Sequence, residues 1–573
     1  MSLTGRRLRQ WALLLPTLGL VAGSSGVVLE PWAVVLLLAV VGWLAVTTLV
    51  RGVRWTEQLA WLTALLLWAS LDALLRPVWP RLAAASVAVG VVVLLLALVA
   101  QDLRVQAGAH PALVVGATVT AVWLLVERLA LGSRPGGPFA NPDLGATVAL
   151  LGLAVLPNLA APLALKLAAA TATLAGILAS GSRAAMLGVV VVGLASMLWQ
   201  GSWRLRLGAA VLAGAAAVGF VVRLAVDQDP LRFERVRLWQ VAVQTARAEF
   251  PWGCGPAGYL DAALPHNFPR GGEFAHYHRI PSEAEGDLLQ LAATLGLPGV
   301  AIGLGLAWAS WRVLRQSGVA GWGVAAAVAT TAAFHSQLGF LAVAWPTTLA
   351  VVGCGRPRAG GRWRLSWGVA VASVVALLVP AAVALGVGGT RPVSPAARPA
   401  AAERLTAATL GSDAALADVE AAVWQECQAR PRSAQALRTL GAVRLQRAEL
   451  RHEAELLEAA LAAFRQAQAV NPLDAWAALG TARACRLLGR LDAAEEALTT
   501  AVSLEPNFAV AWVDLARLHL ERGDLEKSRR ALGRAQLALA RARSVHFVSE
   551  YERALVAVEP AALGRLRAAV GRP

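Results

Sequence analysis

The chain has 573 residues, of which 57% are hydrophobic and 15% are charged, and its mean hydropathy is +0.57. Soluble domains carry about 25% charged residues, so this composition excludes a wholly soluble protein and predicts that lipid surrounds most of the chain. The net charge of +16 does not indicate nucleic-acid binding, because the arginines are scattered rather than gathered in a basic run with aromatic residues. The four cysteines lack the spacing of a zinc site or a disulfide framework.

The N-terminal half is a succession of apolar runs. Residues 6–9 (RRLR) precede a run without a small-residue cleavage site, so we interpret that run as a first span and not as a signal peptide. Because a span needs about 20 apolar residues, the sequence predicts about 12–13 spans within residues 1–390. The runs lie near residues 11–29, 31–50, 57–75, 82–100, 111–131, 143–159, 161–179, 183–200, 206–226, 287–312, 319–335, 337–354 and 366–388.

The arginines near the span ends predict the orientation of the bundle. With a cytoplasmic N-terminus, each inner loop carries positive charge, whereas Arg76 and Arg81 are exceptions on the outer side. The inner arginines are Arg51, Arg54, Arg104, Arg204, Arg206, Arg312, Arg315, Arg356, Arg358, Arg362 and Arg364. This orientation predicts that residues 227–286 and everything beyond about 390 are extracytoplasmic.

Residues 227–286 form the one long polar insertion among the spans. They hold six arginines, two of the three tyrosines and three of the eight histidines, including His276 and His278. An insertion of this length indicates a functional lid or a small subdomain, and a solvated loop is the alternative. Its aromatic residues argue against disorder.

Two further polar residues lie at predicted outer ends of spans. Arg183 begins a span after Ser180-Gly181-Ser182. It is either a snorkelling anchor or a functional residue, and its outer position favours function. His335 ends another span, where it is either a structural group or a ligand contact.

Four stretches, in this order, resemble the O-antigen ligase and O-antigen polymerase superfamily, whose members are bacterial membrane glycosyltransferases acting on undecaprenyl-diphosphate-linked glycans. They are residues 136–143 (GGPFANPD), 181–185 (GSRAA), 237–259 (RLW, then PWGCGPAGY) and 287–299 (DLLQL, then LGLPG). The resemblance covers about residues 10–355. It implies an all-α transmembrane bundle of the GT-C type, a multi-pass location in the bacterial inner membrane, and a reaction that needs neither metal nor cofactor.

One position departs from the family's pattern. The His that is thought to be catalytic in the family corresponds to Glu285, and the following Asn corresponds to Gly286. The resemblance and the chemistry together assign catalytic roles to Glu285, Arg183 and Arg237. The arginines would neutralise the departing diphosphate, which a guanidinium binds with two donors.

The base that accepts the proton of the acceptor hydroxyl has more than one candidate. Glu285 occupies the position in the motif, and burial near lipid headgroups would raise its pKa. His276 or His278 is the alternative. Glu283 and Glu285 have a second interpretation as acidic residues at a helix start that is capped through Pro281-Ser282. We expect five residues to contact substrate: Asn141, Arg235, His276, His278 and His335.

Residues 403–573 repeat with a period of 34, which is the length of a tetratricopeptide repeat (TPR). Phe464, Leu498 and Leu532 follow this period, as do Ala467, Ala501 and Ala535. Small residues would let paired helices approach while Phe or Leu fills the space between repeats. Residues 391–402, rich in Pro and Ala, are the predicted linker. We expect an α-solenoid whose groove binds a protein partner.

These features support two hypotheses of function. In the first, the protein is a glycosyltransferase that ligates or polymerises a lipid-linked glycan onto a glycan, a lipid A core or a protein. In the second, it is a non-catalytic, TPR-bearing assembly protein of a polysaccharide biosynthesis or export complex. A transporter is disfavoured because ionisable residues are rare in the spans, with Asp72, Glu127 and Arg128 as exceptions.

Overall fold

The computed structural model describes residues 11–22, 24–25, 28–29, 31–76, 80–132, 135–139, 141–199, 203–226, 234–335, 341–355, 363–388, 413–547 and 549–571. The chain forms two compact units. The membrane unit comprises residues 1–259 and 283–392, and the repeat unit comprises residues 260–282 and 393–573. The predicted linker, residues 391–402, lies outside the described residues.

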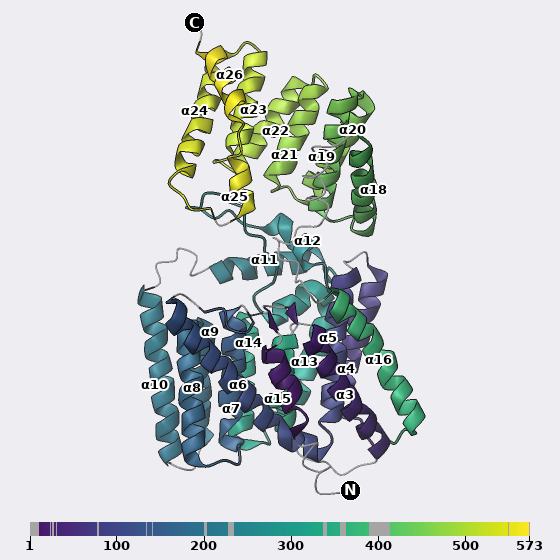
Figure 1. Ribbon diagram of the computed structural model, residues 1–573, viewed down its shortest axis with the longest axis vertical. Helices are drawn as coiled ribbons and strands as arrows, with labels where there is room; N and C mark the ends of the chain where they lie inside the picture. Colours follow the sequence, from purple (N-terminus) through teal and green to yellow (C-terminus); the bar gives the residue numbers. More distant parts are fainter. Residues whose placement is uncertain are drawn as a thin grey trace. The chain divides into compact units, whose positions relative to one another are not determined.

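The all-α fold class is confirmed. Each predicted apolar run contains a helix, and the strands among the described residues are the two-residue pair Ser24–Ser25 and Val28–Leu29. The helices of the membrane unit are α2 (Leu14–Ala22), α3 (Pro31–Arg51), α4 (Glu57–Leu75), α5 (Pro80–Val99), α6 (Leu103–Leu131), α7 (Pro142–Val155), α8 (Leu163–Ser180), α9 (Arg183–Trp199), α10 (Trp203–Val226), α11 (Glu234–Ala248), α13 (Asp287–Leu314), α14 (Gly318–Phe334), α15 (Leu341–Gly353) and α16 (Trp367–Gly388) (Figure 1).

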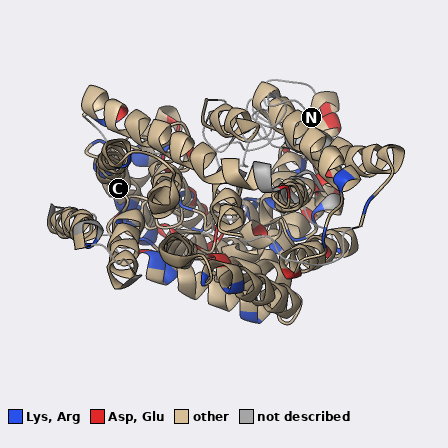
Figure 2. Cartoon of the chain, turned by 90° about the horizontal axis from the view of Figure 1, so that it is seen from below, with Lys and Arg blue, Asp and Glu red and all other residues tan. Residues whose placement is uncertain are grey.

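The surface of this unit is apolar along its helices. Among the described residues, six helices are long and apolar enough to cross a membrane, and six apolar helices of 10–17 residues accompany them. Large side chains such as Leu67, Leu74, Val211 and Val218 are exposed, which lipid tolerates and water does not. Long stretches of helix carry no charged residue (Figure 2). The protein is therefore a multi-pass membrane protein.

Leucine, valine and alanine fill the interior of the membrane unit. Helix α9 packs against α10 and α14, α6 packs against α7 and α8, and α16 packs against α3 and α5. Helix α13 contacts α4, α11 and α14. These contacts bring the start of α13, the end of α14 and the start of α7 into one part of the unit, where the polar residues described below lie.

The repeat unit contains antiparallel helix pairs, seen in Figure 1 as α19 with α20, α21 with α22, and α23 with α24. Its helices are α12 (Tyr259–Ala263), whose first residue belongs to the membrane unit, and α18 (Asp413–Ala429), α19 (Ala434–Arg451), α20 (Ala454–Val470), α21 (Ala475–Leu487), α22 (Leu491–Leu504), α23 (Ala509–Glu521), α24 (Leu525–Ala542), α25 (Glu550–Leu555) and α26 (Pro560–Val570).

The residues of the 34-residue period occupy the expected positions in this unit. Phe464, Leu498 and Leu532 are buried in α20, α22 and α24, and the three periodic alanines are fully buried. Phe464 packs so closely on α21 that a Cβ added to Gly480 would lie 2.3 Å from its ring. The predicted α-solenoid is confirmed.

Candidate functional site

Helix α11 presents Arg235 and Trp239 on one face, since residues four apart are neighbours on a helix. The indole N–H of Trp239 donates to the backbone carbonyl of Glu285 at 2.8 Å. Its ring packs on Phe334 with the ring centroids 5.9 Å apart. Trp239 therefore fastens α11 both to the segment before α13 and to the end of α14.

Glu285 lies in the turn immediately before α13. Its φ is +52°, a left-handed conformation that is uncommon for residues other than glycine. The turn is held by the Gln290 side chain, whose oxygen accepts from the Ala284 N–H at 2.8 Å. Strained backbone of this kind persists where surrounding contacts fix it, and it is frequent at functional sites.

The second interpretation of Glu283 and Glu285, as residues of a cap, is wrong. Helix α13 begins at Asp287 with Gly286 in the N-cap position, and no side chain caps it. Ser282 lies too far before the helix start to bond to its free N–H groups.

The carboxylate of Glu285 belongs to a cluster with Arg235, His335 and Asp143. Glu285 Oε2 lies 3.5 Å from His335 Nδ1 and 3.9 Å from Arg235 Nε. Arg235 Nη2 lies 3.3 Å from His335 Nε2, and Asp143 Oδ1 lies 4.0 Å from the same ring nitrogen. The side chain of His335 is 7% exposed, against 31% for Glu285. The buried imidazole is thus ringed by two carboxylates and one guanidinium.

Asn141 helps to place Asp143 in this cluster. It is the N-cap of α7, with its side-chain oxygen accepting from the Asp143 N–H at 2.9 Å. Gly136 and Gly137 precede Asn141 in the sequence, and their N–H groups donate to the carboxylate of Glu127 at 3.2 and 2.7 Å. The first family-like stretch is therefore a fixed turn that sets the start of α7. A substrate contact by Asn141 stays a prediction.

The predicted catalytic arginines occupy different positions. Arg183 begins α9 and is half-buried, whereas Arg237 is exposed on α11. Residues two apart on a helix point in different directions, and it is Arg235 whose guanidinium faces Glu285 and His335. The catalytic roles of Arg183 and Arg237 stay predictions.

The glycine-rich stretch after α11 packs against a break in α13. Gly296, inside α13, has φ +64° and ψ −159°. The Gly255 N–H donates to the Thr294 carbonyl at 2.8 Å, and the Leu297 N–H donates to the Pro251 carbonyl at 2.7 Å. A Cβ on Gly296 would lie 2.2 Å from the Pro251 oxygen, and one on Gly253 would lie 2.4 Å from the Thr294 oxygen. Only glycine fits both positions.

Helix α4 ends against the same break. Trp68 donates to the Leu295 carbonyl at 3.0 Å, and Arg76 donates to the Gly253 carbonyl. Arg76 also pairs with the buried Asp72 at 2.6 Å. The exception to the arginine pattern thus has a local reason, because Arg76 is held by specific partners. The side chain of Arg81, the other exception, lies outside the described part of the chain.

Tyr259 and Glu283 are polar residues of this region to which the sequence assigned no role in the site. Tyr259 is 3% exposed, and its hydroxyl has no hydrogen-bond partner among the described residues. Burial, followed by the charges of Glu285 and Asp287, raises the pKa of Glu283 to about 8. Burial is also the main cause that raises the pKa of Tyr259, with Glu285 and Glu283 contributing. The sequence signals were the aromatic residue that ends the glycine-rich stretch and the closely spaced carboxylates.

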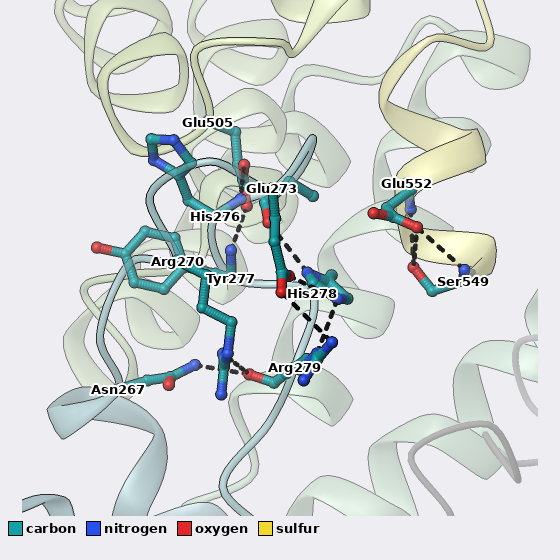
Figure 3. Close-up of polar contacts among 11 residues, drawn as sticks. Asn267, Arg270, Glu273, His276, Tyr277, His278, Arg279, Glu505, Ser549 and Glu552 are labelled. Atoms are coloured by element: carbon teal, nitrogen blue, oxygen red, sulfur yellow. Dashed lines mark hydrogen bonds and ion pairs between the residues drawn. The ribbon is translucent and has the colours of Figure 1, made fainter. Parts of the chain in front are cut away.

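His276 and His278 belong to the repeat unit. The His276 N–H donates to Glu505 at 2.7 Å, and His278 Nε2 lies 3.1 Å from Glu273 (Figure 3). Burial lowers the pKa of His276. Their roles as alternative bases or substrate contacts stay predictions.

The cluster has the groups that a transfer reaction needs. The imidazole of His335 lies near a carboxylate on each side, and a histidine so placed can accept the proton of a hydroxyl. The adjacent guanidinium can bind anionic oxygens. Within the described residues, no three His, Cys, Asp or Glu side chains are arranged to hold a metal ion.

Comparison with known proteins confirms the resemblance. The family model described as O-antigen ligase matches residues 168–304, and a tetratricopeptide-repeat model matches residues 488–546. No curated protein sequence matches the chain. Among solved structures, the crystal structure of MamA is 16% identical over 26% of this chain and 99% of its own, with a TM-score of 0.17. The O-antigen ligase match supports a membrane glycan ligase role in general.

Proposed function

We propose that this protein is a glycosyltransferase that transfers or polymerises an undecaprenyl-diphosphate-linked glycan on the outer side of the bacterial inner membrane. The observation that carries the proposal is the cluster of Glu285, His335 and Arg235 within the membrane unit. The outer location is supported by the distribution of arginines over the inter-span loops.

The reaction exchanges one bond to the anomeric carbon for another. The oxygen of the acceptor hydroxyl bonds to the anomeric carbon, the bond from that carbon to the diphosphate oxygen breaks, and the electron pair leaves with the lipid diphosphate. His335, held by Glu285, accepts the proton of the hydroxyl. This pair takes the place of the His that is absent from the motif at position 285.

Arginine supplies the positive charge that the departing diphosphate requires. Arg235 lies beside both the carboxylate and the imidazole, and it can exchange these contacts for phosphate oxygens. Arg183 and Arg237 are the other candidates for this role. The donor binds from the membrane, and the acceptor is a glycan, a lipid A core or a protein.

The proposal is tested by substitutions in cells with surface glycan as the readout. Glu285→Gln, His335→Gln and Arg235→Lys are each expected to abolish or strongly reduce surface glycan, while the protein is inserted at the normal level. Arg247→Lys is the matched control, since Arg247 is exposed on the same helix as Arg235. Normal glycan in all three variants would contradict a catalytic role.

The alternative is a non-catalytic assembly protein that recruits partners through its repeats. The repeats are compatible with such a role. In that case the three substitutions would leave glycan unchanged, and deletion of residues 403–573 would remove it.

A further inference from the structure

Part of the long inter-span loop is built into the core of the repeat unit. Ala275 is fully buried in the same hydrophobic cluster as residues of α20 to α24. Phe274 is 6% exposed, and its ring meets Phe547 edge-on with the centroids 5.2 Å apart. A loop that only covered the solenoid would not insert small and aromatic side chains to this depth.

A carboxylate of the solenoid binds the backbone of this loop. Glu505, at the end of α22, is fully buried. Its two oxygens accept from the N–H groups of His276 and Tyr277 at 2.7 and 2.8 Å, as Figure 3 shows. The Tyr551 hydroxyl donates to it at 3.1 Å. A buried carboxylate is costly without such donors, so the solenoid carries a charge that the loop satisfies.

Asn507 extends this recognition by one residue. Its side-chain N–H donates to the Phe274 carbonyl at 2.7 Å, and its oxygen accepts from Arg541 at 3.3 Å. Glu505 and Asn507 thus bind the backbone of residues 274–277 on both its donor and its acceptor groups.

The other end of the loop is held by an ion pair. Arg430, 9% exposed, donates to both oxygens of Asp261 at 2.9 and 3.2 Å. It also pairs with Glu426 at 2.8 Å. One nitrogen of Arg430, Nη2, makes both contacts to Asp261, and a charge-assisted contact between largely buried groups is stronger than a neutral hydrogen bond.

Between these two ends, hydrogen bonds and ion pairs within the loop hold its conformation. Arg270, 2% exposed, donates from its side chain to the Arg279 carbonyl at 3.0 Å, and its N–H donates to the His276 carbonyl at 3.0 Å. Glu273 pairs with His278 at 3.1 Å and with Arg279 at 3.3 Å (Figure 3). The bound conformation is therefore fixed from within as well as by the solenoid.

We propose that the helical repeats bind this chain's own inter-span segment, residues 260–282, in cis. We call this contact the clamp: the repeats hold residues 260–282, which connect Tyr259 to Glu283 along the chain. This assignment requires the repeats and residues 227–286 to lie on the same side of the membrane. It does not depend on the glycosyltransferase proposal.

The clamp can be tested in the full-length protein without a glycan assay. A protease site is inserted within residues 393–400, and the protein is cleaved in isolated membranes. The membranes are then washed in high salt to remove electrostatic adsorption and sedimented. With the native sequence, the severed repeats are expected to stay with the membranes. Complete release into the supernatant would overturn the proposal.

Variants identify the contacts that hold the severed repeats. Glu505→Gln keeps the shape but offers one acceptor where two are used, so retention is expected to weaken by about tenfold or more. Glu521→Gln is the matched control, because Glu521 pairs with Arg486 on the solenoid surface. Equal retention of both variants, or equal loss from both, would contradict the assigned role of Glu505.

A second pair of variants guards against misfolding. Asp261→Arg and Arg430→Asp are each expected to lower retention, and their combination is expected to restore part of it, which a misfolded solenoid could not do. No recovery in the double variant, with folded repeats by circular dichroism, would count against the clamp at this end.

Discussion

The left-handed backbone at Glu285 predicts that two substitutions there will differ in their effect on stability but not in their effect on activity. Glu285→Gly and Glu285→Ala both remove the carboxylate that lies 3.5 Å from His335 Nδ1. At φ +52°, a residue with a Cβ is strained by roughly 1–2 kcal/mol. Glycine avoids this strain but loses about 0.5–1 kcal/mol more conformational entropy on folding. The glycine variant should therefore be more stable than the alanine variant by about 0.5–1 kcal/mol.

The assay is thermal unfolding of the two purified variants in the same detergent, together with surface glycan in cells. The difference corresponds to a melting temperature about 1 °C higher for the glycine variant, and both variants should lack glycan. Arg247→Gly and Arg247→Ala are the matched control on helix α11. There the glycine variant should be the less stable one, by about 1 kcal/mol. The same sign at both positions, or normal glycan in Glu285→Gly, would refute the reasoning.

Three further predictions concern the surroundings of this residue. The pKa of Glu283 is raised to about 8, so its contribution to stability is present at low pH and is lost as the pH rises through 8. Glu283→Gln should flatten the fall in melting temperature between pH 5 and pH 8.5, and a pH profile that the substitution leaves unchanged would contradict the raised pKa. Gly296→Ala places a Cβ 2.2 Å from the Pro251 backbone oxygen and should cost more than about 2 kcal/mol, measured as lost folded yield in detergent. Gly208→Ala, inside helix α10 with nothing within 4 Å, should lose no folded yield, because alanine favours the helix. Trp239→Phe removes the 2.8 Å hydrogen bond to the Glu285 carbonyl but keeps an aromatic ring, so the transfer rate should fall about fivefold to tenfold with little change in KM; an unchanged rate would remove Trp239 as a positioning residue.

Periodicity and composition were enough to predict the architecture. The apolar runs located the helices of the membrane unit other than α11, which lies in the polar insertion, and the 34-residue spacing of Phe464, Leu498 and Leu532 located the repeats. These signals are local or strictly periodic, so they can be read without knowing which elements meet.

The candidate site was harder to predict from the sequence than the architecture, because its residues come from distant elements. His335 and Glu285 were both selected, but their pairing depends on the packing of α13 against α14. The choice of Arg237 over Arg235 followed the motif, whereas the phase of α11 turns Arg235 toward the cluster. Nothing in the spacing of Asp143 indicated that it would join His335.

The division of the long loop was not foreseen for a similar reason. Its residues 260–282 form a compact unit with the repeats, although more than 200 residues of sequence separate Tyr277 from Glu505. The contacts that Glu505 makes to backbone N–H groups leave no signature in the side chains of His276 and Tyr277. In the sequence, Glu505 was the sign that the repeats bind this segment. It follows α22 within a periodic stretch, where it resembled an ordinary helix end.

The central claim is tested most directly by purified protein in liposomes, supplied with an undecaprenyl-diphosphate-linked glycan and an acceptor glycan. The account predicts that the native protein releases undecaprenyl diphosphate and extends the acceptor, and that Glu285→Gln and His335→Gln do neither while Arg247→Lys does both. Equal release of undecaprenyl diphosphate by the native protein and by the Glu285→Gln and His335→Gln variants would contradict it.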